Sequence, residues 1–313
     1  MNIWNGIDSY PDDAPAVVGT IGNYDGVHLG HRAILREVVD DAERRGVGSL
    51  LVTFSPHPVS VVAPDRRPQM LQNRGQKLES LGQTGLSDLL ILEFDEQLAA
   101  LSGETFFDRY LAERVRFAAL HVGESFRFGH GRGGDLALLR EIGARRGFEV
   151  DGVSAVEIDG HVISSTAIRL ALAGGDPSLA RRMLGRPYTI AGEVVEGDGR
   201  GRRLDCPTAN VDPNNDILLL PGVYVTETRV IANRFPSVTN VGVRPTFDGK
   251  TLIVETHLLE CDDDLYHEAI EVAFLERIRD EMRFDHANQL ADQLARDRAA
   301  ALAYFQNQSL GAP

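Results

Sequence analysis

The pattern of apolar residues changes near residue 184, and this change limits most strongly what the chain can fold into. Before it, apolar runs such as "APAVVGTIG" and "SLLVTFSPHP" alternate with stretches of helical spacing. After it come short alternating runs such as "YTIAGEVV" and "LIVETHLLE", separated by Gly, Pro, Asp and Asn. The first pattern predicts an α/β domain with a parallel sheet, and the second predicts an antiparallel β-barrel. We therefore expect two domains, residues 1–184 and residues 185–313.

Two helices can be bounded from the sequence. One begins near His31 in "HRAILREVVDDAERRG" and ends at Gly46, because glycine readily adopts the left-handed conformation that closes a helix. The other is the terminal helix, which runs from about Asp285, a candidate N-cap, to Phe305. The expected apolar faces comprise Ile34, Leu35, Val38, Val39 and Ala42 in the first helix and Leu290, Leu294, Ala301 and Phe305 in the second.

Charge and composition exclude several classes of protein. The formal net charge is -14, which argues against a nucleic-acid or anionic-membrane binder, since polyanions need a basic surface. Two isolated cysteines, Cys206 and Cys261, make neither a metal framework nor a disulfide scaffold. The N-terminus lacks the pattern of a secretory signal, and no apolar run has the length of a membrane span. We expect a cytoplasmic protein that is a monomer or a weak oligomer.

The stretch "GTIGNYDGVHLGH" combines a strand, a glycine-rich turn and a helix start. Gly22, Gly26 and Gly30 let the backbone approach a ligand closely. His28 and His31 would lie near the helix N-terminus, where imidazole N–H groups can bond a phosphate and its developing charge. Two alternatives remain open at this point: a pair of surface or turn histidines, and half of a zinc site.

A second stretch, "ISSTAIRLALAGGD", favours the phosphate interpretation. Hydroxyl groups, helix-terminal N–H groups and a guanidinium together suit a pyrophosphate. The simpler alternative is an ordinary helix N-cap. Two phosphate-type loops in one α/β domain are less easily explained by chance. The residues concerned are Ser164, Ser165, Thr166 and Arg169.

The second half contains the segment "GDGRGRRLDCPTANVD". Glycines at Gly197, Gly199 and Gly201 suggest a loop whose N–H groups can meet phosphates. Oxygen ligands such as those of Thr208 and Asn210 suit Mg²⁺ on nucleotide phosphates, although turn chemistry is the commoner role for such residues.

The strand-like run "IVETHLLE" carries the other polar candidates of this half. It places Glu255 and His257 on one face, where a carboxylate could accept a proton from a substrate hydroxyl or simply face solvent.

These motifs resemble those of a known family. "GNYDGVHLGH" and "ISSTAIR" look like the HxGH and second signatures of the Rossmann-like nucleotidylyltransferases, and "FSPHP", "VGESFRFGHGRGGD" and "LGRPY" narrow the likeness. In the second half, "PTAN", "PGVYV", "NVGVRPTF", "VETHLL" and "FLERIRDEMRF" look like a riboflavin kinase module. The whole chain thus resembles the bifunctional bacterial riboflavin kinase and FMN adenylyltransferase, also called FAD synthetase.

For the first domain, the resemblance implies transfer of AMP from ATP to the phosphate of FMN, giving FAD and pyrophosphate. It implies that His28 and His31 are catalytic and bind ATP. Asn23 and Asp25 would shape the loop and help to place nucleotide or metal. The other implied ATP-binding residues are Gly22, Ser164, Ser165, Thr166 and Arg169. It implies flavin-side residues Pro56, His57, Pro58, Ser125 and Arg127, with Arg132 a further phosphate candidate. Pro56 and Pro58 are equally compatible with a turn that packs against the sheet.

For the second domain, the resemblance implies transfer of the γ-phosphoryl group of ATP to riboflavin, giving FMN. Glu255 would be the base, and Thr208 and Asn210 would bind Mg²⁺ and ATP together with Gly197, Gly199 and Gly201. Arg279 and Glu281 would lie near the flavin. The implied substrates and products are riboflavin, FMN, FAD and ATP.

The sequence departs from the family pattern at a few positions. Ser125 stands where an Asp or Asn is usual, which puts that contact in question but not the site. Asp205 and Cys206 replace a Gly-Phe pair, and His267 replaces a glycine. Two alternatives to the bifunctional enzyme follow: a working adenylyltransferase with an impaired kinase, and a flavin-binding carrier or regulator without turnover. Another kind of nucleotidylyltransferase would have no need of the barrel.

Overall fold

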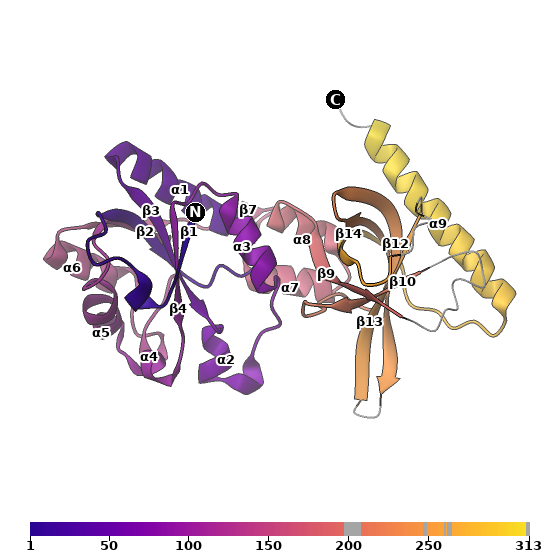
Figure 1. The fold of residues 1–313 in the computed structure, drawn as a ribbon, viewed down its shortest axis with the longest axis horizontal. Helices are drawn as coiled ribbons and strands as arrows, with labels where there is room; N and C mark the ends of the chain where they lie inside the picture. The colour runs from indigo at the N-terminus through magenta and orange to yellow at the C-terminus, as the bar shows by residue number, and fades with distance from the viewer. Residues whose placement is uncertain (197–207, 247–248, 260, 262–264, 311–313) are drawn as a thin grey trace. The chain divides into compact units, whose positions relative to one another are not determined.

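The computed structural model describes residues 1–196, 208–246, 249–259, 261 and 265–310 (Figure 1). The chain divides into two compact units, which are described separately. Unit 1 comprises Met1–Pro68 and Arg74–Ser164, and unit 2 comprises Gln69–Asn73 and the chain from Ser165 onward. Residues 165–184 thus group with the barrel by their contacts, whereas the sequence places the domain boundary after residue 184. That boundary remains a prediction.

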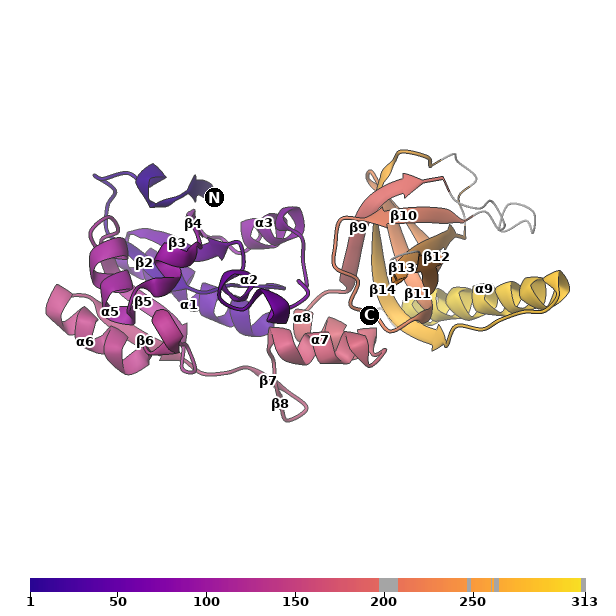
Figure 2. The ribbon, with the colours of Figure 1, turned by 90° about the horizontal axis from the view of Figure 1, so that it is seen from below.

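Unit 1 contains a six-stranded, fully parallel sheet with the strand order β1-β4-β3-β2-β5-β6, and the predicted α/β architecture is confirmed. Strand β1 was not predicted, because its sequence "NIWN" is mostly polar and exposed at the edge of the sheet. A small hairpin, β7–β8, stands away from the sheet (Figure 2). The strands are β1 (Asn2–Asn5), β2 (Val17–Ile21), β3 (Gly48–Ser55), β4 (Asp88–Glu93), β5 (Phe117–Gly123), β6 (Glu149–Val153), β7 (Glu157–Ile158) and β8 (His161–Val162).

Helices cover both faces of this sheet, because neighbouring residues of a buried strand point to opposite faces. Leu51 packs with α1 and α3 on one face, and Leu50 packs with η3 and α6 on the other. The helices of unit 1 are α1 (Leu29–Arg45), α2 (Pro58–Val62), α3 (Arg74–Gly82), α4 (Glu96–Ala100), α5 (Gly103–Thr105) and α6 (Leu136–Arg146), with short η1 (Ile7–Ser9), η2 (Pro64–Arg66), the π-helical η3 (Phe106–Leu111) and η4 (His130–Arg132).

Helix α1 ends where the sequence predicts. Gly46 is its C-cap with a left-handed φ of 68°, and its N–H donates to Ala42 and Glu43 carbonyls. The helix starts two residues before His31, at Leu29, and His28 forms the N-cap. Its N-terminus therefore points the first histidine into the turn that follows β2.

Unit 2 begins with two helices and continues as a closed barrel of six antiparallel strands in the order β10-β13-β12-β11-β14-β9, as predicted. Helix α8 packs on β9 and β14. The elements are α7 (Ser165–Ala173), α8 (Pro177–Leu184), β9 (Tyr188–Val195), β10 (Ala209–Pro213), β11 (Gly222–Val230), β12 (Asn233–Thr246), β13 (Gly249–Leu258), β14 (Ala269–Arg279) and α9 (Ala287–Leu310).

The terminal helix α9 runs along one side of the barrel (Figure 2). Val223 and Val225 of β11 and Val238 of β12 pack against its buried Ala301 and against Phe305. The predicted N-cap at Asp285 is wrong, because the helix starts at Ala287. Asp285 instead donates its backbone N–H to Gln289 Oε1 at 3.3 Å.

The barrel encloses a ring of five buried hydroxyl groups. The ring runs from Thr226 through Ser237, Thr228, Thr256 and Thr239 back to Thr226, across strands β11, β12 and β13. Five hydrogen bonds of 2.7 to 3.2 Å close it. A hydroxyl group has one proton to donate, so five groups and five bonds require each group to donate once and accept once. The ring thus satisfies polar side chains that are 0% exposed.

Candidate functional site

The turn after β2 lies where a ligand site is expected. The chain runs from β2 through β3 and β4 toward one edge of the sheet and then crosses to β5 on the other side of β2. Ligands of open α/β sheets bind at the carboxyl ends of the strands, where the strand order reverses in this way. Tyr24, Gly26 and Val27 adopt positive φ values of 50°, 84° and 39°. Such values are costly for Val in particular and are typical of functional turns.

The two histidines of this turn lie against each other. The rings of His28 and His31 stack with centroids 3.5 Å apart and planes 15° apart. The His31 backbone N–H donates to His28 Nδ1 at 3.2 Å, so a neutral His28 carries its proton on Nε2. Burial and the neighbouring His28 and Lys77 hold the pKa of His31 well below its usual value, so this ring is neutral at pH 7. His31 Nδ1 is buried and has no hydrogen-bond partner among the described residues. Because buried polar atoms normally have such a partner, this nitrogen is a candidate to bind a ligand.

Lys77 of α3 is a residue of this site that the sequence did not single out. Its Nζ donates to the Asn23 carbonyl at 2.6 Å and to Thr53 Oγ1 at 3.0 Å. Burial lowers the pKa of Lys77 to about 8, and the Asp25 carboxylate, itself 3% exposed, opposes that effect. The site therefore contains a buried cation directly behind the turn.

The structure joins two motifs that the sequence treats separately. The Asn23 side-chain amide lies 3.2 Å from His57 Nε2, so "GNYDGVHLGH" and "FSPHP" meet. His57 also caps α2 through its Nδ1, which accepts from the Val59 N–H at 3.2 Å. Pro56, which follows a cis peptide bond, is exposed, and Pro58 is half-buried.

The segment before α7 approaches the histidine turn through its backbone. A Cβ at Gly30 would lie 3.5 Å from the Ile163 carbonyl oxygen and 3.2 Å from the His28 ring. Glycine at this position thus permits three groups to come close. Ser164, the next residue, is the last of unit 1.

The other predicted phosphate ligands belong to unit 2. Ser165 and Thr166 form the first turn of α7, and Arg169 follows on the same helix. Arg169 Nε donates to the Gln69 carbonyl at 2.6 Å, so this contact holds the side chain against the Gln69–Asn73 segment of the same unit.

Ser125 and Arg127 are exposed in the loop after β5. Arg127 Nη1 donates to the Phe126 carbonyl at 2.8 Å. Arg132 is exposed in η4. An aromatic cluster, which the sequence analysis did not identify, joins this loop to the end of β3; its members are Phe54, Phe94, Phe106, Tyr110, Phe126 and Phe128.

In the barrel, strand register brings the kinase candidates together. Asn210 of β10 pairs directly with Glu255 of β13, which pairs in turn with Asn240 of β12. Directly paired residues share a face, so the three polar side chains form a row across three strands. Asn240 opens the quoted "NVGVRPTF" motif, but only the register reveals its place beside Glu255. Thr208 is exposed immediately before β10, and Gly197, Gly199, Gly201, Asp205 and Cys206 lie outside the described residues.

Glu281 and Arg279 have different surroundings. A Cβ at Gly242 would lie 2.8 Å from Glu281 Oε1 and 3.0 Å from Asn240 Nδ2, so Glu281 lies beside the polar row. Arg279 instead binds the buried Asp297 of α9, through Nε at 3.0 Å and Nη2 at 2.7 Å. That pair fixes the end of β14 to the terminal helix.

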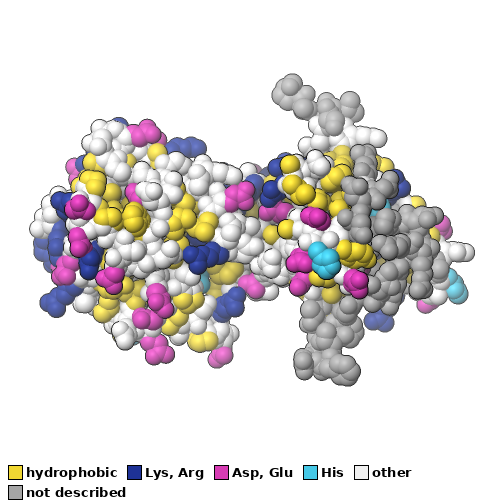
Figure 3. Space-filling view, in the orientation of Figure 1, with side chains coloured by type: hydrophobic (Ala, Val, Ile, Leu, Met, Phe, Trp, Pro, Cys, Tyr) yellow, Lys and Arg dark blue, Asp and Glu magenta, His cyan; other side chains and the backbone are white. Residues whose placement is uncertain are grey.

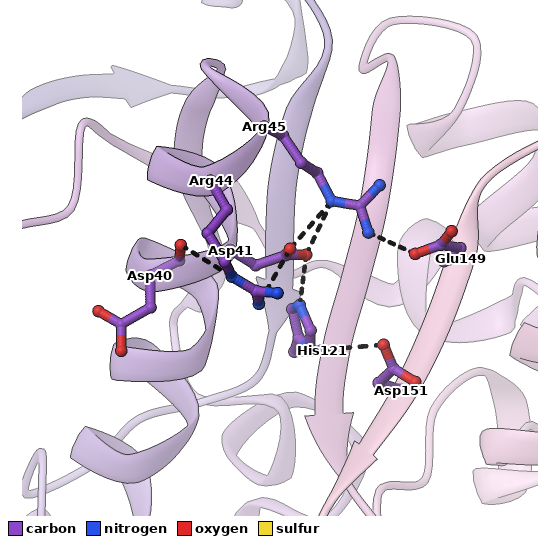
Figure 4. Close-up of polar contacts among 7 residues, drawn as sticks. All are labelled: Asp40, Asp41, Arg44, Arg45, His121, Glu149 and Asp151. Atoms are coloured by element: carbon purple, nitrogen blue, oxygen red, sulfur yellow. Dashed lines mark hydrogen bonds and ion pairs between the residues drawn. The ribbon is translucent and has the colours of Figure 1, made fainter.

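A third polar cluster lies at the opposite end of α1 (Figure 4). Asp41 is buried and accepts hydrogen bonds from His121 Nε2 of β5 and from Arg45 Nε, both at 3.0 Å. Arg45 continues to Glu149 of β6. Burial raises the pKa of Asp41, but the hydrogen bonds from His121 and Arg45 outweigh it, so the pKa lies below its usual value. This cluster ties α1 to the sheet and takes no part in the histidine turn.

The surface carries charges of both signs. On the face of unit 1 that Figure 3 shows, acidic and basic side chains are interspersed. Within the described ranges, no group of three or more His, Cys, Asp or Glu side chains could hold a metal ion, so the zinc alternative finds no further ligands there. Nor does any helix of that part of the chain have the length and apolarity to cross a membrane.

Comparison with known proteins covers both units. The FAD synthetase family matches residues 10–167, and the riboflavin kinase family matches residues 184–305. A bifunctional riboflavin kinase/FMN adenylyltransferase of Escherichia coli (strain K12) is 39% identical over 91% of this chain and 92% of its own length. The chain belongs to this bifunctional family. The corresponding protein of Pseudomonas fluorescens is also 39% identical, over 97% of each chain.

A solved structure agrees with this assignment in its fold. A chain of Streptococcus pneumoniae described as a macrolide-efflux protein superposes with a TM-score of 0.86 at 28% identity, covering 96% of this chain and 99% of its own. The family's two activities, riboflavin kinase and FMN adenylyltransferase, are those that the motifs predict, and the order of the two matched regions is the predicted order.

Proposed function

We propose that the two activities are divided between the sites described above: FMN is adenylylated at the histidine turn, and riboflavin is phosphorylated at the polar row of the barrel. The observation that carries the first assignment is the stacked His28–His31 pair at the N-terminus of α1, in which the buried His31 Nδ1 has no hydrogen-bond partner within the part of the chain that the structure describes. The observation that carries the second is the direct pairing of Asn210 with Glu255.

Adenylyl transfer needs placement and charge stabilisation rather than covalent catalysis. A phosphate oxygen of FMN attacks the α-phosphorus of ATP, the bond to the β-phosphate breaks, and pyrophosphate leaves. His28 Nε2–H and the backbone N–H groups of Leu29 and Gly30, at the start of α1, would face the developing negative charge. Ser164, Ser165, Thr166 and Arg169 hold the β- and γ-phosphates, and Gly22, Asn23 and Asp25 shape the turn.

The flavin is placed beside the "FSPHP" segment. The aromatic cluster supplies flat surfaces on which an isoalloxazine ring can stack. Pro56, His57 and Pro58 line one side, and Ser125, Arg127 and Arg132 meet the phosphate side. A serine at position 125 donates one hydrogen bond and carries no charge.

In the barrel, Glu255 accepts the proton of the riboflavin 5′-hydroxyl as that oxygen attacks the γ-phosphorus of ATP and ADP leaves. The half-buried carboxylate has the neutral side chains of Asn210 and Asn240 on either side, and these set its place in the row.

Magnesium fits this donor set. The hydroxyl oxygen of Thr208 and the amide oxygen of Asn210 are hard ligands of the kind that Mg²⁺ prefers, and Thr208 is exposed to a nucleotide. When bound, Mg²⁺ neutralises charge on the ATP phosphates. The motif adds Gly197, Gly199 and Gly201, which lie outside the described residues, as proposed donors of backbone N–H groups to the same phosphates. Glu281 borders the flavin, and Arg279 supports it from the β14–α9 junction.

The remaining proposals concern the cellular setting. We place the enzyme in the cytoplasm as a monomer or weak oligomer that binds neither nucleic acid nor membranes. The net charge of -14 and the mixed surface charges support this.

The test is a time course with riboflavin, ATP and Mg²⁺, in which the flavins are separated by chromatography. FMN followed by FAD is expected. From riboflavin, His28→Ala should form FMN but no FAD. Glu255→Ala should form no FMN from riboflavin but should still form FAD when FMN is supplied. Loss of both activities in either folded variant would contradict the division into two sites. If the parent enzyme converted supplied FMN but not riboflavin, it would be a working adenylyltransferase with an impaired kinase. If it converted neither, it would be a flavin-binding carrier or regulator.

A further inference from the structure

Lys77, a half-buried residue with a buried ammonium group, raises a question that the histidine turn alone does not answer. Its ammonium group is shielded from water, yet its hydrogen-bond partners among the described residues are both neutral, a backbone carbonyl and a threonine hydroxyl. A buried charge with such partners is destabilising unless it is fully compensated. The compensating charge is the buried Asp25 carboxylate of the turn, so the reason for a lysine at position 77 is to be sought in that turn.

What Lys77 holds is the start of the strained turn. The Asn23 carbonyl accepts from Lys77 Nζ at 2.6 Å and from Thr53 Oγ1 at 3.3 Å. Directly after Asn23 come the residues with positive φ, including Val27 at 39°. Backbone in such conformations persists only where the surroundings determine it. Lys77 is one of those determinants, from a helix 54 residues further along the chain.

Charge points the same way. Burial and its neighbours keep His31 neutral, so its ring brings no positive charge to the triphosphate. Asp25 is buried within the turn, and its carboxylate raises the pKa of Lys77 against the effect of burial. The positive charge of Lys77 offsets the negative charge of Asp25, so the turn does not repel the phosphate oxygens of ATP.

We propose that Lys77 is a positioning residue of the adenylyl-transfer site. It fixes the Asn23 end of the turn, and this fixes the orientation of His28 and His31. It also supplies the buried positive charge behind these histidines. This inference rests on the function proposed for the histidine turn. Lys77 acts through the turn rather than by contact with the reacting atoms.

The test compares Lys77→Met and Lys77→Arg in the full-length enzyme, with Glu79→Gln as a matched control on the exposed face of α3. Each variant is assayed for FAD formation from FMN, for FMN formation from riboflavin, and for Tm. We expect Lys77→Met to lower kcat for FAD formation by about tenfold or more and to change KM for ATP by less than about threefold. The reason is that the substitution misorients the two histidines without removing the residues that bind ATP.

The two reactions should respond differently. Methionine leaves the buried Asp25 carboxylate without its cation, so the Tm of Lys77→Met should fall, while FMN formation in the folded variant stays at the parent level. A merely structural lysine would, when removed, lower both activities together with Tm. Lys77→Arg keeps the charge and should recover FAD formation to within about fivefold of the parent, while FMN formation stays unchanged throughout.

Three results would overturn the proposal: unchanged FAD formation in Lys77→Met, a fall of Tm with parallel loss of both activities, or equal loss in folded Lys77→Arg and Lys77→Met. A parent enzyme that makes FMN but no FAD would instead refute the function assigned to the turn, and this inference with it.

Discussion

The hydroxyl ring inside the barrel makes a sharp prediction about Thr226. Its Oγ1 bonds Ser237 at 2.8 Å and Thr239 at 2.7 Å, and its side chain is 0% exposed. Replacing Thr226 by Val keeps the shape and removes the hydroxyl. The four remaining groups then share three bonds, so one end of the chain keeps a donor, and the other an acceptor, without a partner.

The magnitude follows from those losses. Two buried hydrogen bonds, each worth about 1 kcal/mol net, and one orphaned donor should together destabilise unit 2 by about 2 to 4 kcal/mol. Thr226→Ser keeps the ring intact and loses one buried methyl group, which should cost about 1 kcal/mol.

Urea unfolding, followed by the tertiary signal of the barrel, measures both variants. The order of stability should be parent, then Thr226→Ser, then Thr226→Val. A Val variant as stable as the Ser variant, or more so, would show that packing dominates and that the closed ring contributes nothing of its own.

Three further predictions concern other parts of the chain. The pKa of Asp41 lies below its usual value of 3.8 in the folded state, so the stabilisation that its carboxylate provides is present above about pH 4 and is lost as the pH falls further. Asp41→Asn should therefore weaken the pH dependence of the free energy of unfolding, measured in urea between about pH 2 and 5, and should lower that free energy near pH 7 by about 2 to 3 kcal/mol. His267→Gly should stabilise the enzyme by up to about 1 kcal/mol in thermal unfolding whereas His267→Ala should not, because the residue has a φ of 67° and its exposed contact with Glu193 adds little. Glu255→Gln should reduce FMN formation by about a hundredfold or more and leave FAD formation from FMN intact, and retained kinase activity would remove Glu255 from the role of base.

Local sequence signals were enough for most of the architecture. Apolar alternation predicted the parallel sheet and the barrel, and Gly46 fixed the end of α1, because these signals act over a few neighbouring residues. The same reasoning failed at Asp285, where a plausible capping side chain lies one residue too early, and at β1, whose pairing with β4 depends on a distant strand. Such errors arise where a contact remote in sequence outweighs local preference.

The candidate site shows the same division. His28, His31 and Glu255 were found because motifs place them beside glycines or in alternating strands. Lys77 was missed because nothing in "GQKLES" signals a lysine that turns inward to meet Asn23. Asn240 became visible only through its register with Glu255, and Asp41 only through its contact with His121. Residues whose role is created by the fold require the fold to be seen.

The path of the chain between its two units bears on how such a protein can change over evolutionary time. The Gln69–Asn73 segment groups with the barrel unit, where the Met70 N–H donates to Asp216 Oδ2 at 2.7 Å and Asn73 Nδ2 to Asn215 Oδ1 at 3.4 Å. The chain therefore leaves unit 1, returns to it at Arg74, and leaves it again after Ser164. If the gene were divided once, after the codon for Ser164, the Gln69–Asn73 segment would be encoded with unit 1 and separated from the unit that it contacts. This arrangement opposes the division of the enzyme into two independently inherited halves.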